Sequence, residues 1–384
     1  MNTKRWCALL VVATWLSGCS TIGEWFAADT TEPPSPLPSL TTEEVLRSLW
    51  TASSGVGSAK QFLRLRPIVM EGRVVVSNAD GSVAAYDTSG GGQLWRTETG
   101  IALSGGSGGG SGLVVVGGSK GEIVALNLKD GSERWHTSLS SEILAPPAAA
   151  DGVVAVRTMD GRVVGLSATD GGRMWVFSRT VPILSLRGTS APLIAKGRVF
   201  VGLDSGHLIS LGLQDGHVLW EAIVAVPKGR SELERMVDID SDPVLFDGTL
   251  YVAAFQGQVV AVNAVDGQLY WAREISSATG LGIDRNHVYV TDEDSVVWAL
   301  DRSTGSALWR QEVLRNRALT APAPYGDAVL VGDLEGYLHS LDREDGRILG
   351  RFHLESSPIL ASPVVQGVLL YAIGSGGTVA ALRD

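Results

Sequence analysis

Short apolar runs bounded by Gly, Asp or Pro fill the chain from about residue 66 to its end. One stretch shows the pattern clearly: Lys-Gly, Asp-Ser-Gly and Gln-Asp-Gly separate the apolar runs 191–195, 198–203, 207–213 and 217–224. Such turn sequences are typical of β-hairpins, and apolar runs of this length are typical of strands. Because the runs show no helical periodicity, we predict an all-β fold with four strands in each unit.

The unit recurs as Gly-x-Val-x-Ala-Leu followed by Asp-Gly-x-x-x-Trp. Successive copies begin at positions 81, 121, 161, 206, 257, 294, 336 and 377. A period near 40 residues with several short strands per copy is typical of a β-propeller. The seventh copy has Gly350 where Trp is expected, and the eighth stops before its last strand.

Residues 46–50, Leu-Arg-Ser-Leu-Trp, supply a candidate for that missing strand, with Trp50 in the Trp position. Pairing this strand with the C-terminal one would remove two open sheet edges. We therefore predict an eight-bladed β-propeller of four-stranded blades, closed by the N-terminal strand; seven blades with a frayed end is the alternative. The repeated Trp residues are predicted to pack between adjacent blades, because large aromatic side chains dominate core burial. They are Trp50, Trp95, Trp135, Trp175, Trp220, Trp271 and Trp309.

The N-terminus has the pattern of an export signal. Lys4 and Arg5 precede an apolar run at 6–15, which is too short to span a bilayer. Residues 16–19, Leu-Ser-Gly-Cys, resemble the bacterial lipobox. We predict a signal peptide at 1–18, a lipidated Cys19 with a Pro-rich extended spacer at 19–44, and the propeller at 45–384. An ordinary signal peptide that ends near a Cys is the alternative. Ser20, rather than Asp, implies delivery to the outer membrane by the enterobacterial sorting pattern.

Composition narrows the possible chemistry. A net charge of −10 disfavours nucleic acid as a partner. Both cysteines, Cys7 and Cys19, lie at the N-terminus, and the six histidines show no metal-binding spacing. The Gly-rich run 104–112 lacks a following Lys, so we predict a flexible connection between blades rather than a phosphate-binding loop. We expect no catalytic residue, no metal and no cofactor.

Two consecutive connections between repeats are long. From Trp175 to Pro192 is 17 positions and from Trp220 to Pro243 is 23, whereas the corresponding stretch from Trp135 to Pro147 is 12. Equivalent connections emerge on the same face of a propeller, so these neighbours would form one binding patch. We call residues 178–192 the first long loop and residues 226–243 the second long loop.

Both long loops contain residues suited to a protein interface. The first long loop places Ile183, Leu184 and Leu186 beside Arg187, and apolar side chains next to Arg are typical of interfaces. The second long loop is rich in charge: Glu232, Glu234, Arg235, Asp238 and Asp240. The alternative is that the loops only pack on each other, with Arg187 paired to an Asp.

The lipobox, the Pro-rich spacer, the Trp repeats and the loop pair together resemble the BamB family, the lipoproteins of the outer-membrane β-barrel assembly machinery. The match covers essentially the whole chain and is most specific at 184–192, 232–244 and 332–347. The resemblance implies a non-catalytic scaffold that binds the periplasmic POTRA domains of BamA, the barrel-forming insertase. It also implies the interface residues Leu184, Leu186, Arg187, Asp238 and Asp240.

The same resemblance implies a monomer within a hetero-complex, beside other components of the assembly complex. The propeller would lie in the periplasm, held to the outer membrane by its lipid anchor. Unfolded outer-membrane proteins are expected as further partners, received by strand addition at blade edges.

Two other functions stay open. The Trp repeat also resembles that of the quinoprotein dehydrogenases, which are eight-bladed enzymes using pyrroloquinoline quinone and calcium. Those enzymes are longer and typically carry a vicinal Cys pair, which this chain lacks after residue 19. A periplasmic propeller lipoprotein that binds a small ligand is the other alternative, and it predicts polar residues along the central channel.

Overall fold

The computed structural model describes residues 32–40, 46–186 and 190–384. The predicted signal peptide, Cys19 and Arg187 lie outside the described residues. The chain divides into two compact units, Met1–Pro33 and Pro34–Asp384, and the fold described below is that of the second. Within the described part, no helix has the length and apolarity needed to cross a membrane.

The regular secondary structure of the described residues is entirely β, in 32 strands. One sheet joins the first strand to the last three, in the order β1 (Arg47–Ser53), β32 (Thr378–Arg383), β31 (Leu369–Ile373) and β30 (Val364–Gln366). Five other sheets each contain four consecutive strands. Their strands are β2 (Ile68–Met70), β3 (Arg73–Ser77), β4 (Ser82–Asp87) and β5 (Gln93–Glu98); β14 (Leu193–Ala195), β15 (Arg198–Gly202), β16 (His207–Gly212) and β17 (Val218–Ile223); β18 (Val244–Phe246), β19 (Thr249–Ala253), β20 (Gln258–Asn263) and β21 (Leu269–Glu274); β22 (Leu281–Ile283), β23 (His287–Thr291), β24 (Val297–Asp301) and β25 (Ala307–Gln311); and β26 (Ala323–Tyr325), β27 (Ala328–Gly332), β28 (Tyr337–Asp342) and β29 (Ile348–His353).

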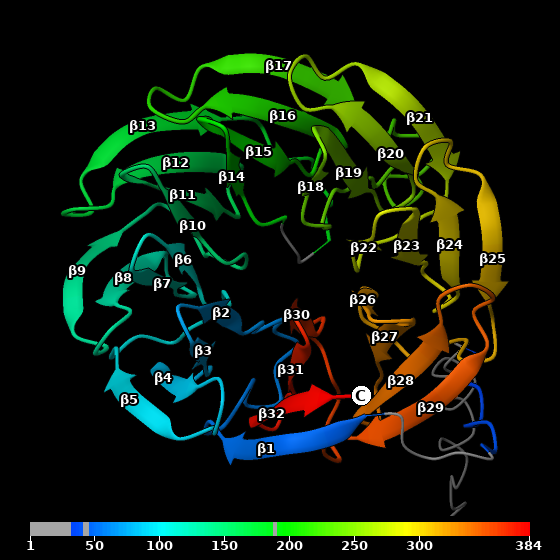
Figure 1. Cartoon of the computed structure of the whole chain (residues 1–384). Helices are drawn as coiled ribbons and strands as arrows, with labels where there is room; N and C mark the ends of the chain where they lie inside the picture. Colours follow the sequence, from blue (N-terminus) through cyan, green and yellow to red (C-terminus); the bar gives the residue numbers. More distant parts are fainter. Residues whose placement is uncertain (1–31, 41–45, 187–189) are drawn as a thin grey trace, which may run out of the picture. The chain divides into compact units, whose positions relative to one another are not determined.

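The remaining sheet is eight-stranded, in the order β13-β12-β11-β10-β6-β7-β8-β9. It contains two groups of four strands: β6 (Gly108–Gly110), β7 (Leu113–Gly117), β8 (Glu122–Asn127) and β9 (Glu133–Ser138); and β10 (Ala148–Ala150), β11 (Val153–Thr158), β12 (Arg162–Ser167) and β13 (Arg173–Ser178). Within each group the strands pair antiparallel, and the groups follow one another around a common centre (Figure 1).

Burial explains the sequence pattern of each group. The second and third strands, such as β15 and β16, are buried at nearly every position because they lie between neighbouring sheets. They therefore read as continuous apolar runs. The outermost strand, such as β17, has a single buried residue among exposed ones, and that residue is the repeated Trp.

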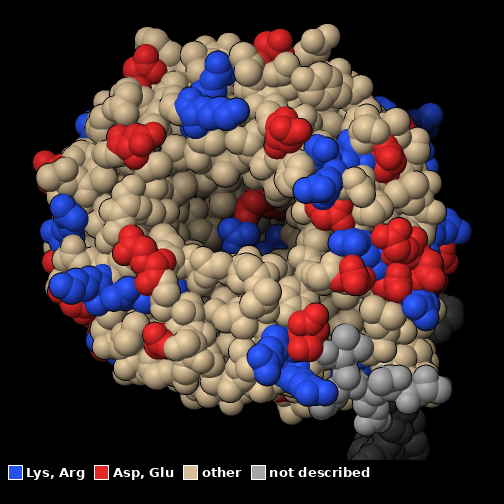
Figure 2. Space-filling view, in the orientation of Figure 1, with Lys and Arg blue, Asp and Glu red and all other residues tan. Residues whose placement is uncertain are grey.

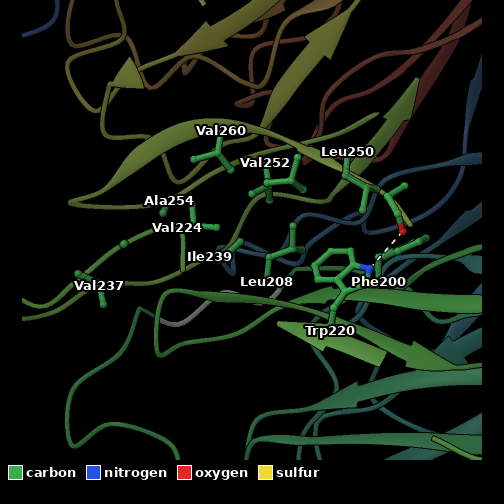
Figure 3. Close-up of a cluster of buried hydrophobic side chains, with 13 residues drawn as sticks. Phe200, Leu208, Trp220, Val224, Val237, Ile239, Leu250, Val252, Ala254 and Val260 are labelled. Carbon is green, nitrogen blue, oxygen red and sulfur yellow. Dashed lines mark hydrogen bonds between the residues drawn. The ribbon is translucent and has the colours of Figure 1, made fainter. Parts of the chain in front are cut away.

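Each repeated Trp packs against the next group of strands, as predicted. Trp220 lies in a buried cluster with Phe200 and Leu250, and its Nε1–H donates to the carbonyl oxygen of Ala264 at 3.2 Å (Figure 3). A Cβ on Gly267 would lie 2.7 Å from the Trp220 ring, so the Asp-Gly turn leaves no room for a side chain. The same Trp–Gly contact recurs for Trp50 and Gly91, Trp95 and Gly131, Trp135 and Gly171, Trp175 and Gly216, Trp271 and Gly305, and Trp309 and Gly346.

The N-terminal strand takes the predicted place. Strand β1 pairs antiparallel with β32 from Arg47 opposite Arg383 to Ser53 opposite Thr378, and Trp50 lies opposite Ala381. Because β1 supplies the outermost strand of a sheet formed otherwise by the C-terminal strands, the first and last strands of the described residues meet in one sheet.

The flexible connection predicted for the Gly-rich run is wrong. Residues Gly108–Gly110 form β6, the innermost strand of its group. The Gly109 N–H donates to the carbonyl oxygen of Pro147 at 3.0 Å, in a parallel pairing that merges two groups into the eight-stranded sheet. A Cβ on Gly108 would lie 1.9 Å from that same oxygen, so glycine here permits close approach of two backbones.

Candidate functional site

The two long loops lie side by side and are joined by hydrogen bonds. The first connects β13 to β14, and the second connects β17 to β18. The Leu186 N–H donates to Asp238 Oδ2 at 3.1 Å, and the Ala191 N–H donates to Asp242 Oδ1 at 2.7 Å. The described parts of the two long loops are therefore neighbours, as predicted; their role as a binding patch stays a prediction.

The first long loop exposes the apolar side chains that the sequence singled out. Ile183 is 87% exposed and Leu184 is 42% exposed, while Leu186 is half-buried. On the second long loop the charged residues Glu232 and Arg235 are exposed. Apolar side chains surrounded by charged ones are the usual composition of a protein interface.

Asp238 and Asp240 lie in the interior, although charged residues of a loop are usually expected on the surface. Asp238 is fully buried, and Asp240 is 5% exposed. The backbone carbonyl of Asp238 accepts from the Phe255 N–H at 2.8 Å, while its carboxylate accepts from Leu186. Asp238 therefore fixes the second long loop to the β19–β20 turn and holds the first long loop in place.

Buried charges surround these two carboxylates. Asp204 forms an ion pair with Arg157, and both side chains are almost completely buried. Burial raises the pKa of Asp238, and the neighbouring Asp240 and Asp204 raise it further. Burial likewise raises the pKa of Asp240, against the opposing effect of the Arg64 guanidinium.

One carboxylate oxygen, Oδ1, of each of Asp238 and Asp240 is buried without a hydrogen-bond partner among the described residues. An unsatisfied buried oxygen disfavours the charged form, which is consistent with the raised pKa of both groups.

A cavity of about 670 Å³ opens beside the loop pair. Its wall combines apolar side chains with charged ones, and the Arg66 guanidinium lies 3.1 Å from the Asp242 carboxylate. Residues that line it include Phe62, Arg64, Leu186, Asp240, Phe255 and Leu281. Figure 2 shows the ring of sheets hollowed at its centre, with acidic and basic side chains inside the hollow.

Sequence reasoning missed the buried charges that support the loops. The sequence does hint that Arg157 is unusual, because this charged residue interrupts the mainly apolar strand Val153–Thr158. Nothing in the neighbouring sequence indicates that it pairs with Asp204. Arg64 and Arg66 also stand among apolar residues ahead of the first copy. Among the described residues there is no group of three or more His, Cys, Asp or Glu side chains placed to hold a metal ion.

A family model described as "Outer membrane protein assembly factor BamB" matches residues 79–311 and 304–384. A protein of that description from Alkalilimnicola ehrlichii is 54% identical over 336 residues, covering 88% of each chain. Another from Pseudomonas aeruginosa is 47% identical over 374 residues, covering 97% of each chain.

The fold resembles solved structures as well. The crystal structure of BamB from Moraxella catarrhalis matches with a TM-score of 0.82 at 27% identity, covering 88% of this chain and all of that one. A quinohemoprotein alcohol dehydrogenase from Comamonas testosteroni matches with a TM-score of 0.68 at 14% identity. The latter likeness concerns the fold alone.

Proposed function

Because the chain belongs to the family of the outer membrane protein assembly factor BamB, we propose that it is an assembly factor of outer-membrane proteins acting as a non-catalytic scaffold. The observation that carries the proposal is the joined pair of long loops, which presents exposed Ile183 and Leu184 on a hydrogen-bonded support. Apolar anchors that are held in position favour protein binding, because less conformational freedom is lost on association.

The scaffold is an eight-bladed propeller closed by its N-terminal strand. The 32 strands of the described part fall into groups of four, and one sheet combines the first of these strands, β1, with the last three, β30–β32. Such a ring suits a scaffold because β1 covers the edge of β32 and ties the first strand of the propeller to the last.

The partner of the loop pair is the periplasmic POTRA region of BamA. Leu184 and Leu186, together with Arg187, make the direct contact. Asp238 and Asp240 act from beneath the surface: the Asp238 carboxylate holds the backbone of Leu186, and Asp240 lines the adjoining cavity. The protein works as a monomer within the assembly complex, tied to the outer membrane by a lipidated Cys19, with the propeller in the periplasm.

Unfolded outer-membrane proteins are a second class of partner. The outermost strands β5, β13, β17 and β21 have exposed apolar side chains, including Leu94, Met174, Leu219 and Tyr270. Each such strand is paired on one side only, so an extended polypeptide can add to it. Site-specific photocrosslinks from these strands to substrate would support the step, and crosslinks that avoid every outermost strand would remove its support.

A pull-down from detergent-solubilised outer membranes tests the main proposal. Wild type should retain BamA, and the double variant Leu186→Ala/Arg187→Ala should lose it. Val265→Ala is the matched control, because Val265 is 64% exposed in the β20–β21 turn, at the opposite ends of the strands. Retention of BamA by the folded double variant would misplace the interface, and absence of BamA from the wild-type sample would refute the function.

A further inference from the structure

The Pro-rich segment behind the predicted anchor is held on the propeller. We call residues 34–38, Pro-Ser-Pro-Leu-Pro, the strap. The Ser35 N–H donates to the carbonyl oxygen of Arg315 at 3.0 Å, and Arg317 Nη1 donates to the carbonyl oxygen of Ser35 at 2.9 Å. Arg351 Nη1 donates to the carbonyl oxygen of Pro38 at 3.1 Å. The strap therefore lies beside β29 (Figure 1).

The chemistry of the strap matches these donors. Proline has no N–H, so the segment offers mainly carbonyl acceptors, and its three prolines favour the polyproline II conformation. That conformation repeats every three residues, which places the carbonyl-bearing residues Ser35 and Pro38 on one side. Guanidinium groups spaced along the propeller can then bind successive turns.

Both arginines are also held by groups of the propeller itself. The Arg317 side chain is 3% exposed and donates to the buried Asp333 carboxylate at 2.8 and 2.9 Å. The Arg351 guanidinium lies over the Tyr337 ring, 5.5 Å from its centroid. Donors that are already oriented lose little side-chain entropy on binding, so they favour a specific docked segment.

We propose that Arg317, Arg351 and the Arg315 carbonyl form a dedicated groove for an extended Pro-rich peptide, which the chain fills with its own residues 34–38. The segment is then a strap fixed to the sheet of β26–β29 and not a free spacer. If Cys19 carries the lipid, residues 20–33 connect it to the strap, and a chain of that length reaches at most about 50 Å. This consequence rests on the proposed lipid anchor; the docking does not.

Hydrogen–deuterium exchange resolved to single residues tests the docking on the full mature chain in detergent. Ser35 and Leu37 have the only amide hydrogens in the strap, because the other three residues are prolines. In wild type the Ser35 amide should exchange at least about tenfold more slowly than in a free peptide of the same sequence, as expected for a hydrogen-bonded amide. Arg351→Ala should bring its exchange close to that of the peptide.

The matched control is Arg343→Ala on the same sheet, whose side chain bonds the Gly326 carbonyl and Asp327 and no strap residue. It should leave Ser35 exchange unchanged. Replacing Pro34, Pro36 and Pro38 by Gly keeps the length and should also abolish protection. Exchange of wild-type Ser35 at the peptide rate, or equal protection in Arg351→Ala, would overturn the proposal. Since no partner is present, neither result bears on BamA binding.

Discussion

The Trp–Gly contact between neighbouring groups of strands makes the sharpest prediction about stability. In Trp220→Ala, a buried ring is lost from a cluster that joins β15–β17 to β18–β20. Truncating a buried Trp or Phe costs about 3–5 kcal/mol of unfolding free energy through lost burial and the cavity left behind. Its Nε1–H also bonds the Ala264 carbonyl, which keeps only a long 3.5 Å contact from Arg198 in the variant. That loss adds about 1 kcal/mol.

Urea denaturation of the soluble chain, without its signal peptide and Cys19, measures this change. We expect Trp220→Ala to lose about 4–6 kcal/mol. The neighbouring Leu219→Ala is the control, because Leu219 is 49% exposed and should change stability by less than about 1 kcal/mol.

A double variant isolates the contact itself. Gly267→Ala should destabilise wild type strongly, because its Cβ would lie 2.7 Å from the Trp220 ring. In the Trp220→Ala background it should cost much less, since the ring is gone and only the strain of φ +74° remains. Additive effects, or a loss below about 1 kcal/mol for Trp220→Ala, would refute the packing argument.

Three further outcomes are expected. Asp238→Asn keeps an acceptor for Leu186 and removes a carboxyl whose pKa burial raises from 3.8 to about 9. Between these two pH values Asp238 ionises in the unfolded chain but not in the folded one, so its contribution to wild-type stability falls as the pH rises. The stability of the variant relative to wild type, measured by urea denaturation, should therefore increase over that range, and a pH-independent difference would count against this reasoning. Gly108→Ala should lower the unfolding free energy by about 2 kcal/mol or more, measured by thermal denaturation. Gly92→Ala is the control, because its Cβ would meet nothing within 4 Å. Equal effects of the two substitutions would contradict the close approach of the Gly108 and Pro147 backbones. Deleting residues 46–53 should expose the β32 edge and produce oligomers in size-exclusion chromatography, whereas a stable monomer would contradict the role given to β1.

The repeat made the strand pattern predictable from sequence, because its signals are local. Each hairpin has its own turn residues, and each buried strand is a continuous apolar run. Even the pairing of β1 with β32 could be predicted, since Trp50 stands where the incomplete last copy lacks its Trp. The sequence explains the glycine of each Asp-Gly turn by the turn alone. Its contact with a Trp of the preceding group of strands is visible only in the packed structure.

The supports of the candidate site could not be predicted in the same way. Asp238 and Asp240 read as exposed loop charges, yet they lie in a continuously buried stretch from Val237 to Ser241. Their neighbours Arg157 and Asp204 are distant in sequence. The strap was predicted as part of an extended spacer because its composition is typical of linkers, whereas its bonds depend on arginines 282 and 313 positions away.

The central claim, that the loop pair binds BamA, is tested most directly by titrating purified BamA POTRA domains onto the soluble chain and measuring the dissociation constant. Leu184→Ala/Leu186→Ala should bind at least about tenfold more weakly than wild type, since truncating buried interface anchors costs more than about 1 kcal/mol each. The control Val265→Ala, which alters an exposed side chain at the opposite ends of the strands, should bind like wild type. Equal affinity of the folded double variant and wild type would contradict the claim.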